Sequence, residues 1–476
     1  MNRAYDIAAF RNLIGGIKCE DNSILVKQKS RDFYWYSPVL KRELESVTGD
    51  MVVTPANEAE VATVLAAAHK LKIPVTPRGG GTGNYGQAMP LTGGIVLNLI
   101  EMNRILSIDT GRVIAEPGAI LLDIDKATAA SGQEMRMFPS TRATASVAGF
   151  IAGGSGGVGS ITWGGLRDFG NVLRLRVMTM EAEPRRLELT GENLHKAVHA
   201  YGTNGVITEV EMPLAARYEW VEAIVGFDSF EAATAYALAL GEQDGILKKL
   251  VTVVAAPAPQ LYFLRHRSFI PAGKSVVLTM IAPQSLDAFE AFTRLNRGAE
   301  TLFHSARAKP EDLKGLPPIY ELAWNHTTLR ALRVDPSITY LQVRYPLDKG
   351  PEVIRRIHER FAGEVIGHLE LIRFNGRLGF AGLPLVRFST EERLQAIMNE
   401  HEAMGAPIFN PHRYTLEEGG MKQTDAIQLA FKRETDPDGL LNPGKMIAWD
   451  DPEFDYSARK NYLFPGLEAR ALAAQG

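Results

Sequence analysis

The chain of 476 residues contains a single cysteine, Cys19. One thiol cannot form an internal disulfide, and a thiolate zinc site or an iron–sulfur cluster needs several, so all three are excluded. Long apolar runs are also missing, and the first eighteen residues carry Asp6 and Arg11 where a signal peptide would be apolar. We therefore expect no transmembrane helix and no secretory signal, and a cytoplasmic protein is the default.

Neither sign of charge dominates the sequence. Lysine and arginine total 52 against 55 for aspartate and glutamate, which gives a formal charge of -3. A protein without an excess of positive charge does not attract nucleic acid, so we expect no nucleic-acid partner. The length exceeds what one hydrophobic core accommodates, so two or three structural units are expected.

Short strands and helices alternate along the first 215 residues. Asn57, followed three residues later by Glu60, predicts the start of a helix, and Val61 and Val64 begin its apolar stripe. A helix is also expected over residues 194–200. Strands are expected over residues 73–75, 94–99, 112–116, 173–180 and 206–212.

Glycine becomes sparse from about residue 216, where amphipathic helices begin to alternate with strands. The pattern predicts helices over residues 230–241 and 352–361, a tail helix over residues 424–446, and strands over residues 275–281, 340–345 and 365–374. Alternation of this kind indicates a second α+β unit after the first.

Two glycine-rich segments lie about seventy residues apart, and each contains Gly-x-Gly-x-x-Gly, at residues 81–86 and 154–159. A Rossmann site needs a helix directly after these glycines, because the helix N-terminus holds the pyrophosphate. The first match runs into residues 87–94 and the second into residues 160–165, and neither sequence sustains such a helix. We therefore exclude a Rossmann site.

Glycine-rich turns bind phosphate without that fold. Their successive N–H groups form a concave nest for an anion, and the missing side chains allow a close approach. Either segment alone also suits a tight turn or a bulge, and Arg78 either adds charge to the nest or pairs with a surface carboxylate. Two such segments in one unit favour a large ligand with two phosphates.

The two segments resemble the flavin loops of the vanillyl-alcohol-oxidase/PCMH superfamily of FAD-binding proteins. Residues 75–83, Val-Thr-Pro-Arg-Gly-Gly-Gly-Thr-Gly, are similar to the first loop, and residues 139–157 are similar to the second. Residues 163–173 and 201–208 resemble later motifs of the same FAD domain. The turn Leu-Asn-Pro-Gly-Lys at residues 441–445 matches the C-terminal signature of the D-lactate dehydrogenase/glycolate oxidase branch.

The resemblance implies an α+β protein with a PCMH-type FAD-binding domain over residues 1–215, an α+β cap over residues 216–423, and a tail over residues 424–476 that returns to the FAD domain. It implies non-covalent FAD, since the first loop lacks histidine and cysteine, although attachment through a cap histidine remains open. The cofactor-binding residues that it implies are Pro77, Arg78, Gly79, Gly80, Gly81, Thr82, Gly83, Asn84, Tyr85, Gly86, Gln87, Pro139, Ser140, Thr141, Thr144, Ser146, Gly149, Gly153, Gly154, Ser155, Gly156, Gly157, Val206, Ile207 and Asn442.

The same branch carries histidines that bind a divalent metal or serve the substrate hydroxyl. Its strand motif appears here with His368, but with Asn375 in place of the second histidine, and the later Glu-His-Gly motif retains His412 without the glutamate. Two imidazoles and an amide bind a divalent cation poorly, although Glu370 lies on the same strand face as His368. We assign no metal ligands, and a divalent metal stays an open alternative.

Oxidation of a hydroxyl group on flavin requires a base, an anchor for the substrate and a dry cavity. Neutral imidazole suits the base, so His368 and His412 are the candidates. A planar guanidinium suits a carboxylate anchor, so Arg344 and Arg373 are the candidates, with Asn375 beside them. Each equally fits a packed or surface position, and residues 324–326 favour a pocket by composition alone.

The leading hypothesis is an FAD-dependent dehydrogenase or oxidase that takes a hydride from the carbinol carbon of a small substrate, such as a D-2-hydroxy acid. A non-redox flavoenzyme similar to alkyl-dihydroxyacetone-phosphate synthase, or a flavin-binding accessory subunit of an oxidase complex, remains an alternative. The redox hypothesis also requires an electron acceptor, which would be a quinone, an electron-transfer protein or oxygen. The sequence leaves a homodimer open.

Overall fold

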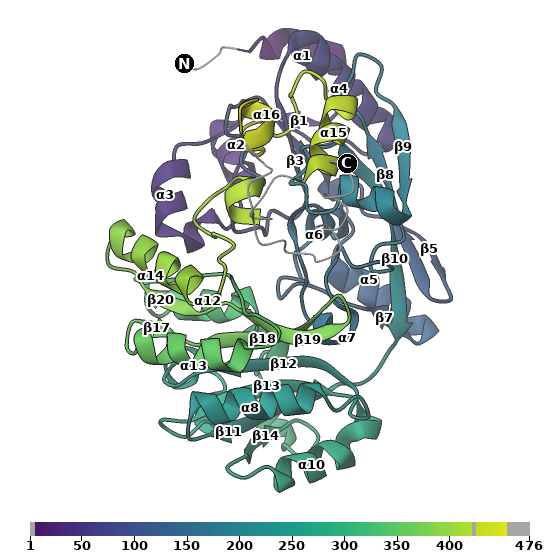
Figure 1. Cartoon of the computed structure of the whole chain (residues 1–476). Coiled ribbons are helices and arrows are strands. Elements are labelled where there is room, and N and C mark those ends of the chain that lie inside the picture. The colour runs from purple at the N-terminus through teal and green to yellow at the C-terminus, as the bar shows by residue number, and fades with distance from the viewer. Residues whose placement is uncertain (1–4, 421–424, 455–476) are drawn as a thin grey trace, which may run out of the picture.

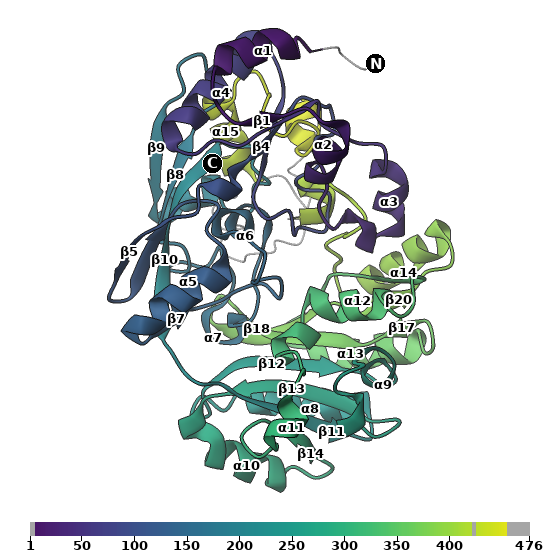
Figure 2. The ribbon, with the colours of Figure 1, turned by 180° about the vertical axis from the view of Figure 1, so that it is seen from behind.

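The computed structural model describes residues 5–420 and 425–454. Figure 1 shows two parts, one formed by the N-terminal half together with the yellow C-terminal helices, and one formed by the teal and green elements. The chain leaves the first part after β10 (Val206–Ala216) and enters the second at β11 (Val221–Phe227). The reverse view in Figure 2 shows the same two parts. Helices and sheets occur in both, which confirms the predicted α+β class.

A small sheet presents the first glycine-rich segment. Its strands, in spatial order, are β1 (Cys19–Glu20), β2 (Met51–Val53), β4 (Ile95–Asn98) and β3 (Val75–Arg78). The last three run parallel, and α4 (Glu58–Leu71) connects β2 to β3. As predicted, the Asn57 side chain accepts the Glu60 N–H at 3.0 Å, and Val61 and Val64 are fully buried. The other helices here are α1 (Ile7–Ile14), α2 (Ser23–Lys29) and α3 (Pro38–Leu44).

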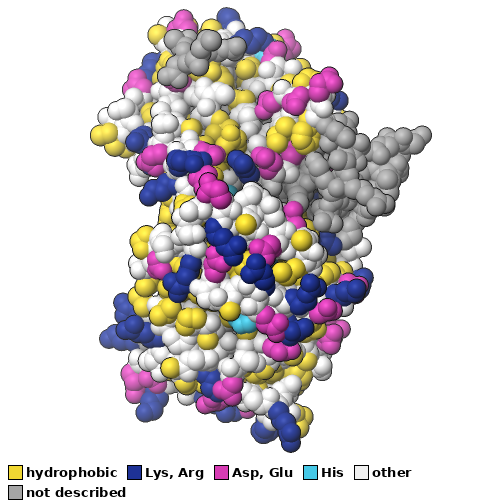
Figure 3. All heavy atoms as spheres, turned by 60° about the vertical axis from the view of Figure 1, so that its left-hand side comes forward, with side chains coloured by type: hydrophobic (Ala, Val, Ile, Leu, Met, Phe, Trp, Pro, Cys, Tyr) yellow, Lys and Arg dark blue, Asp and Glu magenta, His cyan; other side chains and the backbone are white. Residues whose placement is uncertain are grey.

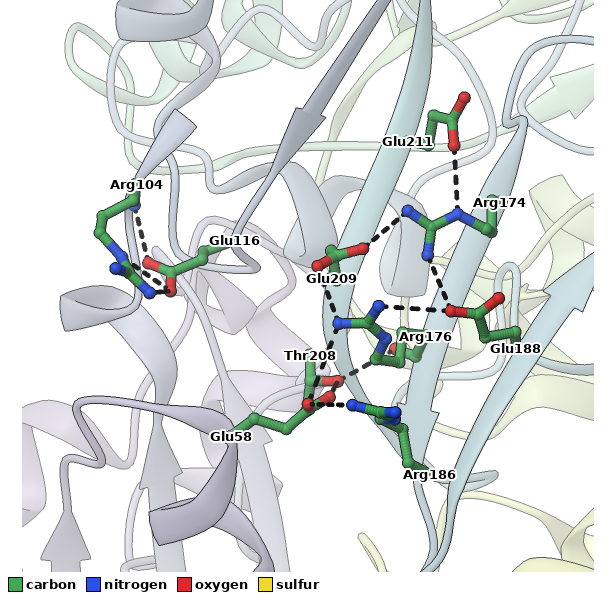
Figure 4. A network of polar contacts seen from close by, with 10 residues as sticks. All are labelled: Glu58, Arg104, Glu116, Arg174, Arg176, Arg186, Glu188, Thr208, Glu209 and Glu211. Carbon is green, nitrogen blue, oxygen red and sulfur yellow. Dashed lines mark hydrogen bonds and ion pairs between the residues drawn. The ribbon is translucent and has the colours of Figure 1, made fainter. Parts of the chain in front are cut away.

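A second, antiparallel sheet completes the first part. Its strands are β5 (Ile105–Asp109), β6 (Arg112–Ala115), β10, β8 (Arg174–Met178) and β9 (Arg186–Thr190), with β7 (Gln133–Met135) paired to β10. Figure 4 shows Arg174 and Arg176 of β8 pointing to one face, where they meet Glu209 of β10 at 2.7 and 2.8 Å. The opposite face buries Leu175 and Val177, because side chains alternate along a strand. Helices α5 (Leu121–Thr128), α6 (Val147–Gly153) and α7 (Ser160–Trp163) belong to this part. The four residues of α7 follow the second Gly-x-Gly-x-x-Gly directly, where no helix was expected.

The second part, called the cap below, is built on a seven-stranded antiparallel sheet. Its strands, in spatial order, are β14 (Glu300–His304), β11, β13 (Ser275–Ile281), β12 (Lys248–Val254), β18 (His368–Phe374), β19 (Arg377–Gly382) and β16 (Val343–Arg344). Its helices are α8 (Phe230–Gly241), α9 (Ala258–Tyr262), α10 (Leu286–Leu295), α11 (Pro310–Leu313), α12 (Asn325–Leu332), α13 (Gly350–Arg360) and α14 (Glu391–Ala403). The predicted helices over residues 230–241 and 352–361 correspond to α8 and α13.

Two strands predicted as continuous are each divided between two sheets. A three-stranded sheet contains β15 (Ile338–Tyr340), β20 (Leu385–Arg387) and β17 (Val365–Ile366). The prediction over residues 340–345 joined β15 to β16, and the prediction over residues 365–374 joined β17 to β18. Gly367 lies at the second break, where an added Cβ would be 2.3 Å from the Phe230 ring. A run of apolar residues predicts a strand, but it does not show that the chain passes from one sheet to another within the run.

The tail returns to the first part, as expected. Helix α15 (Ala426–Thr435) is shorter than the predicted helix, because Asp436 and Pro437 end it, and α16 (Ile447–Asp450) follows the Leu-Asn-Pro-Gly-Lys turn. The predicted first helical residue, Thr424, lies outside the described residues. Leu441 forms a parallel bridge to Val75, so the tail extends the small sheet beside β3.

The helix predicted over residues 194–200 is wrong. The chain forms a 3₁₀ turn over Gly191–Lys196 instead, and His199 and Tyr201 then adopt positive φ angles of 56° and 54°. Their N–H groups donate to the carbonyls of Ile151 and Ala152, which fixes this segment against the end of α6. An α-helix would leave those contacts unmade.

Charges of both signs are interspersed over the face shown in Figure 3, as the balanced composition predicts. Within residues 5–420 and 425–454, no helix combines the length and the apolar character that a bilayer crossing requires.

Burial governs the protonation of three histidines. It lowers the pKa of His199 and His266 to about 4 and that of His412 to about 3. Their unfolded rings titrate near pH 6.5, so between about pH 4 and 6.5 the unfolded chain binds more protons than the folded chain. The free energy of unfolding therefore falls as the pH falls through this window.

We predict that His266→Phe reduces this pH dependence. Both ring nitrogens of His266 lack a hydrogen-bond partner among the described residues, so Phe removes a titrating group without breaking a bond. The slope of unfolding free energy against pH, measured by urea denaturation from pH 6 to 4.5, should decrease by up to about 1.4 kcal/mol per pH unit. Ile270→Val, a nearby change without a titrating group, should alter stability at every pH equally. An unchanged slope in His266→Phe would contradict the assignment.

Candidate functional site

One cavity runs between the two glycine-rich segments and the cap. The residues predicted to bind the cofactor that line it are Pro77, Arg78, Gly79, Gly80, Gly81, Thr82, Gly83, Asn84, Tyr85, Gln87, Pro139, Ser140, Thr141, Ser146, Gly149, Gly153, Gly154, Ser155, Gly156 and Ile207. Gly86, Thr144, Gly157, Val206 and Asn442 are not among its lining residues. The two segments, distant in sequence, therefore form one wall.

Close backbone approach explains the glycines of that wall. A Cβ added at Gly79 would lie 1.9 Å from Ser146 Oγ, and one added at Gly80 would lie 2.1 Å from the Thr144 carbonyl oxygen. Thr144 thus supports the wall from behind, although it was predicted to contact the cofactor directly. The second segment is partly helical, because Gly149 and Gly153 belong to α6. Ser146 caps this helix, and its hydroxyl oxygen accepts the Gly149 N–H at 3.3 Å.

Arg78 folds back against its own segment. Its guanidinium occupies the space beside Gly81, where an added Cβ would be 2.1 Å away, and Nη1 donates to the Arg31 carbonyl at 2.5 Å. Burial lowers the pKa of Arg78, so an anion in the cavity would stabilise its positive charge. Glycines without room for a Cβ, together with this buried cation, suit the diphosphate of FAD.

The C-terminal turn holds the first segment from outside the cavity. Asn442, at a positive φ of 41°, donates through Nδ2 to the carbonyls of Gln87 at 2.8 Å and Tyr201 at 2.6 Å. The Lys445 ammonium donates to the Gly86 carbonyl at 2.5 Å. Asn442 was predicted to bind the cofactor, but it does not line the cavity, and its Nδ2 supports the segment through these backbone oxygens.

The cap contributes Arg344, Arg373 and Asn375 to the lining. Arg344 is half-buried, its guanidinium carbon lies 5.1 Å from the centre of the Phe374 ring, and burial lowers its pKa. Asn375, at a φ of 49°, is the first residue of the two-residue turn that joins β18 to β19. Asparagine suits that turn for conformational reasons, so its presence in place of a histidine has a structural cause.

Arg373 uses its guanidinium for contacts with the cap and with α7 of the first part. Nε donates to the Ile161 carbonyl at 3.1 Å, Nη1 to the Gly376 carbonyl at 3.1 Å, and Nη2 to Asp244 at 2.8 Å. All three nitrogens have protein partners, which engages three of the five guanidinium N–H groups. Arg373 therefore has fewer N–H groups to offer a substrate carboxylate.

His368 is fully buried on β18 and does not line the cavity. Nδ1 lies 3.1 Å from the Leu383 carbonyl and Nε2 lies 2.9 Å from the Glu370 carboxylate, which places Glu370 beside it as strand alternation predicts. Glu370 also accepts hydrogen bonds from Thr252 and from the Trp324 N–H, each at 2.6 Å. Both ring nitrogens thus have partners within the protein, which suits a structural role for His368.

His412 also lies outside the cavity lining. It is buried, and Nδ1 is 2.7 Å from the hydroxyl of Ser37, the residue that caps α3. Neither of the predicted histidines therefore reaches the cavity. Among the described residues, no three of the His, Cys, Asp and Glu side chains gather as ligands of a metal ion would.

Several lining residues had no signal in the motifs. Trp324 and Asn325 line the cavity as their composition suggested, whereas His326 lies behind them, 3.6 Å from Glu321. Others are Phe33, Tyr36, His199, Gln342 and Phe409, whereas Tyr201, Asn204 and Phe374 stand in motif segments but were not predicted as site residues. They come from segments that become neighbours only in the fold.

We predict that Gly80→Ala abolishes FAD binding. The new methyl group would collide with the Thr144 carbonyl and force the two segments apart, so purified protein should be colourless while the fold is retained by circular dichroism. Gly16→Ala is the control, because the space around a Cβ at Gly16 is empty and its φ is not positive. Full flavin content in Gly80→Ala would show that the close approach is dispensable.

Comparisons with known proteins agree with this geometry. Residues 49–188 match the FAD binding domain family. The chain is 33% identical over 435 residues to an uncharacterized FAD-linked oxidoreductase of Mycobacterium tuberculosis, covering 82% of this chain and 89% of that protein. It is 31% identical over 439 residues to glycolate oxidase subunit GlcD of Bacillus subtilis (84% and 89% covered), and 27% identical over 435 residues to D-lactate dehydrogenase of Archaeoglobus fulgidus (83% and 91%).

Two solved structures share the fold at low sequence identity. An alkyldihydroxyacetonephosphate synthase is 17% identical with a TM-score of 0.68, covering 90% of this chain and 82% of that one. A 4-ethylphenol oxidase from Gulosibacter chungangensis is 19% identical with a TM-score of 0.66, covering 92% and 96%. With FAD as its cofactor, the chain belongs to the FAD-linked oxidoreductases related to glycolate oxidase and D-lactate dehydrogenase, which act on CH–OH groups.

Proposed function

We propose that the protein oxidises the carbinol carbon of a small D-2-hydroxy acid and that Arg344 holds the substrate carboxylate. Two relatives, a glycolate oxidase subunit and a D-lactate dehydrogenase, support the substrate class. The observation that supports Arg344 as the carboxylate anchor is its position in the cavity wall, where its guanidinium is partly desolvated against Phe374. A planar guanidinium binds a carboxylate with two parallel hydrogen bonds.

The cap side of the cavity suits a small organic acid. Phe374, Leu383 and Phe409 supply apolar surface, and Asn325 and Gln342 supply amides. Such a wall excludes water from the reacting atoms, which strengthens electrostatic interactions inside the cavity. Bound FAD would supply the redox chemistry, and a quinone, an electron-transfer protein or oxygen would be the electron acceptor.

The buried His368–Glu370 pair supports a positioning role. Glu370 fixes the N–H of Trp324, whose φ of 52° is uncommon for a residue with a bulky side chain. Trp324 and Asn325 both line the cavity, so the pair would hold this part of its wall in place. Direct proton transfer by His368 or His412 is not part of the proposal.

We predict that D-2-hydroxy acids bleach the flavin under anaerobic conditions. Glycolate, D-lactate and L-lactate, together with aromatic alcohols, would be mixed with the oxidised protein, and the loss of the visible flavin absorbance would be recorded. Bleaching by D-lactate or glycolate, with little response to the others, is expected. Bleaching by aromatic alcohols alone, or by no compound, would refute the proposed substrate. Reoxidation with oxygen or with a quinone then identifies the electron acceptor.

We predict that Arg344→Lys weakens substrate binding more than it slows the chemical step. Lysine keeps the positive charge but cannot make two parallel hydrogen bonds, so the concentration for half-maximal flavin reduction should rise about tenfold while the limiting rate changes little. Arg355→Lys is the matched control, since Arg355 is on α13, outside the cavity, in an ion pair with Glu359. Equal behaviour of the two variants would argue against Arg344 as the anchor.

A further inference from the structure

His199 is the histidine that reaches the cavity. All ten histidines of the chain lie in the described residues, and among them His199 alone lines the cavity. It comes from the segment that follows the 3₁₀ turn, between β9 and β10, and not from the motifs that suggested His368 and His412. Its side chain is nevertheless almost wholly buried, with 3% of its surface exposed.

The position of the His199 ring is fixed by its neighbours. The backbone N–H donates to the Ile151 carbonyl at 2.9 Å, and the left-handed φ of 56° turns the side chain toward the second glycine-rich segment. There Nδ1 lies 2.9 Å from the Gly154 carbonyl and 3.2 Å from Ser155 Oγ. Gly154 and Ser155 both line the cavity, so the ring is anchored to the wall itself.

These contacts determine which ring nitrogen carries the proton. A carbonyl oxygen only accepts, so Nδ1–H must donate to Gly154. Burial lowers the pKa of His199 to about 4, so the ring is neutral at neutral pH. Nε2 therefore carries a lone pair and can only accept. It has no hydrogen-bond partner within the described residues, and a Cβ added at Gly420, which also lines the cavity, would be 3.0 Å away.

An unpaired Nε2 alone does not mark a site, as His401 shows. Its Nδ1 donates to the Ile397 carbonyl at 2.8 Å, its Nε2 also lacks a partner in the described part of the chain, and it is fully buried. It lies against the Phe361 ring in the cap and does not line the cavity. What distinguishes His199 is its place in the cofactor wall.

We propose that His199 Nε2 accepts a hydrogen bond from an N–H or O–H donor of bound FAD. The isoalloxazine N3–H, the adenine amino group and the ribityl and ribose hydroxyls are such donors, whereas the ionised diphosphate has none. His199 would thus orient a part of the cofactor that the glycine-rich backbone, through its own N–H donors, cannot. The inference rests on FAD as the cofactor and adds a contact that is independent of the proposed substrate.

His199→Asn tests this contact with little disturbance of the fold. Asparagine tolerates positive φ, and its amide N–H can replace Nδ1–H at the Gly154 carbonyl while the acceptor at Nε2 is removed. Full-length protein stripped of flavin and titrated with FAD should bind it about tenfold or more weakly, because the buried donor of FAD would lose its acceptor. His199→Gln, whose longer amide can place an oxygen near the position of Nε2, should recover part of the affinity.

His401→Asn is the matched control, since it makes the same exchange at a buried ring outside the cavity, and its FAD affinity should equal that of the wild type. Competition by ADP then locates the donor. Unchanged ADP affinity in His199→Asn assigns it to the flavin half of FAD, and weakened ADP affinity assigns it to the adenosine half.

Wild-type FAD affinity in folded His199→Asn would overturn the proposal. If flavin reduction by substrate fell in that variant while FAD affinity stayed unchanged, the donor would belong to the substrate and the proposal would again fail. Neither result depends on which hydroxy acid is oxidised, because FAD affinity is measured without substrate.

Discussion

The cavity depends on one steric constraint, the contact between two backbone segments that leaves no room for a Cβ. Gly79 meets the Ser146 side chain and Gly80 meets the Thr144 carbonyl. Because Ser146 also caps α6, the same residue fixes both the start of that helix and the depth to which the first segment approaches it. A methyl group at this contact would separate the small sheet that carries one segment from the larger sheet that supports the other. The two glycine-rich segments therefore have to come together before the cofactor wall exists.

That contact is maintained by groups from distant parts of the chain. Backbone carbonyls in a glycine-rich turn lack partners of their own, and buried ones must be paired. Asn442 and Lys445 of the tail donate to the carbonyls of Gln87 and Gly86, while Tyr85 donates to Gln342 of the cap. The first segment is thus held between the tail and the cap, which accounts for a tail that returns to the first part after the whole cap. Tail docking and cofactor-site formation are coupled for the same reason.

The sequence patterns correctly predicted the features that short-range interactions determine. The Asn57–Glu60 cap, the stripe of α4, the α+β class and the glycine-rich segments all follow from short-range spacing, and the segments do line one cavity. Residues 194–200 were predicted as a helix, but contacts with Ile151 and Ala152 decided the conformation. Likewise, residues 340–345 divide between two sheets, where Tyr340 and Gln342 accept hydrogen bonds from the first segment.

The histidines show most clearly that a sequence motif does not determine the role of a side chain. A match in sequence identified His368, but its surroundings are set by the Leu383 carbonyl and the Glu370 carboxylate, which lie at its two ring nitrogens. His412 is likewise defined by Ser37, which is distant in sequence. For His199 one nitrogen meets a carbonyl and the other has no partner within the described residues, so its ring presents a lone pair in the cofactor wall. Whether a buried imidazole pairs, packs or accepts therefore follows from the acceptors around it, and these become neighbours only when the chain folds.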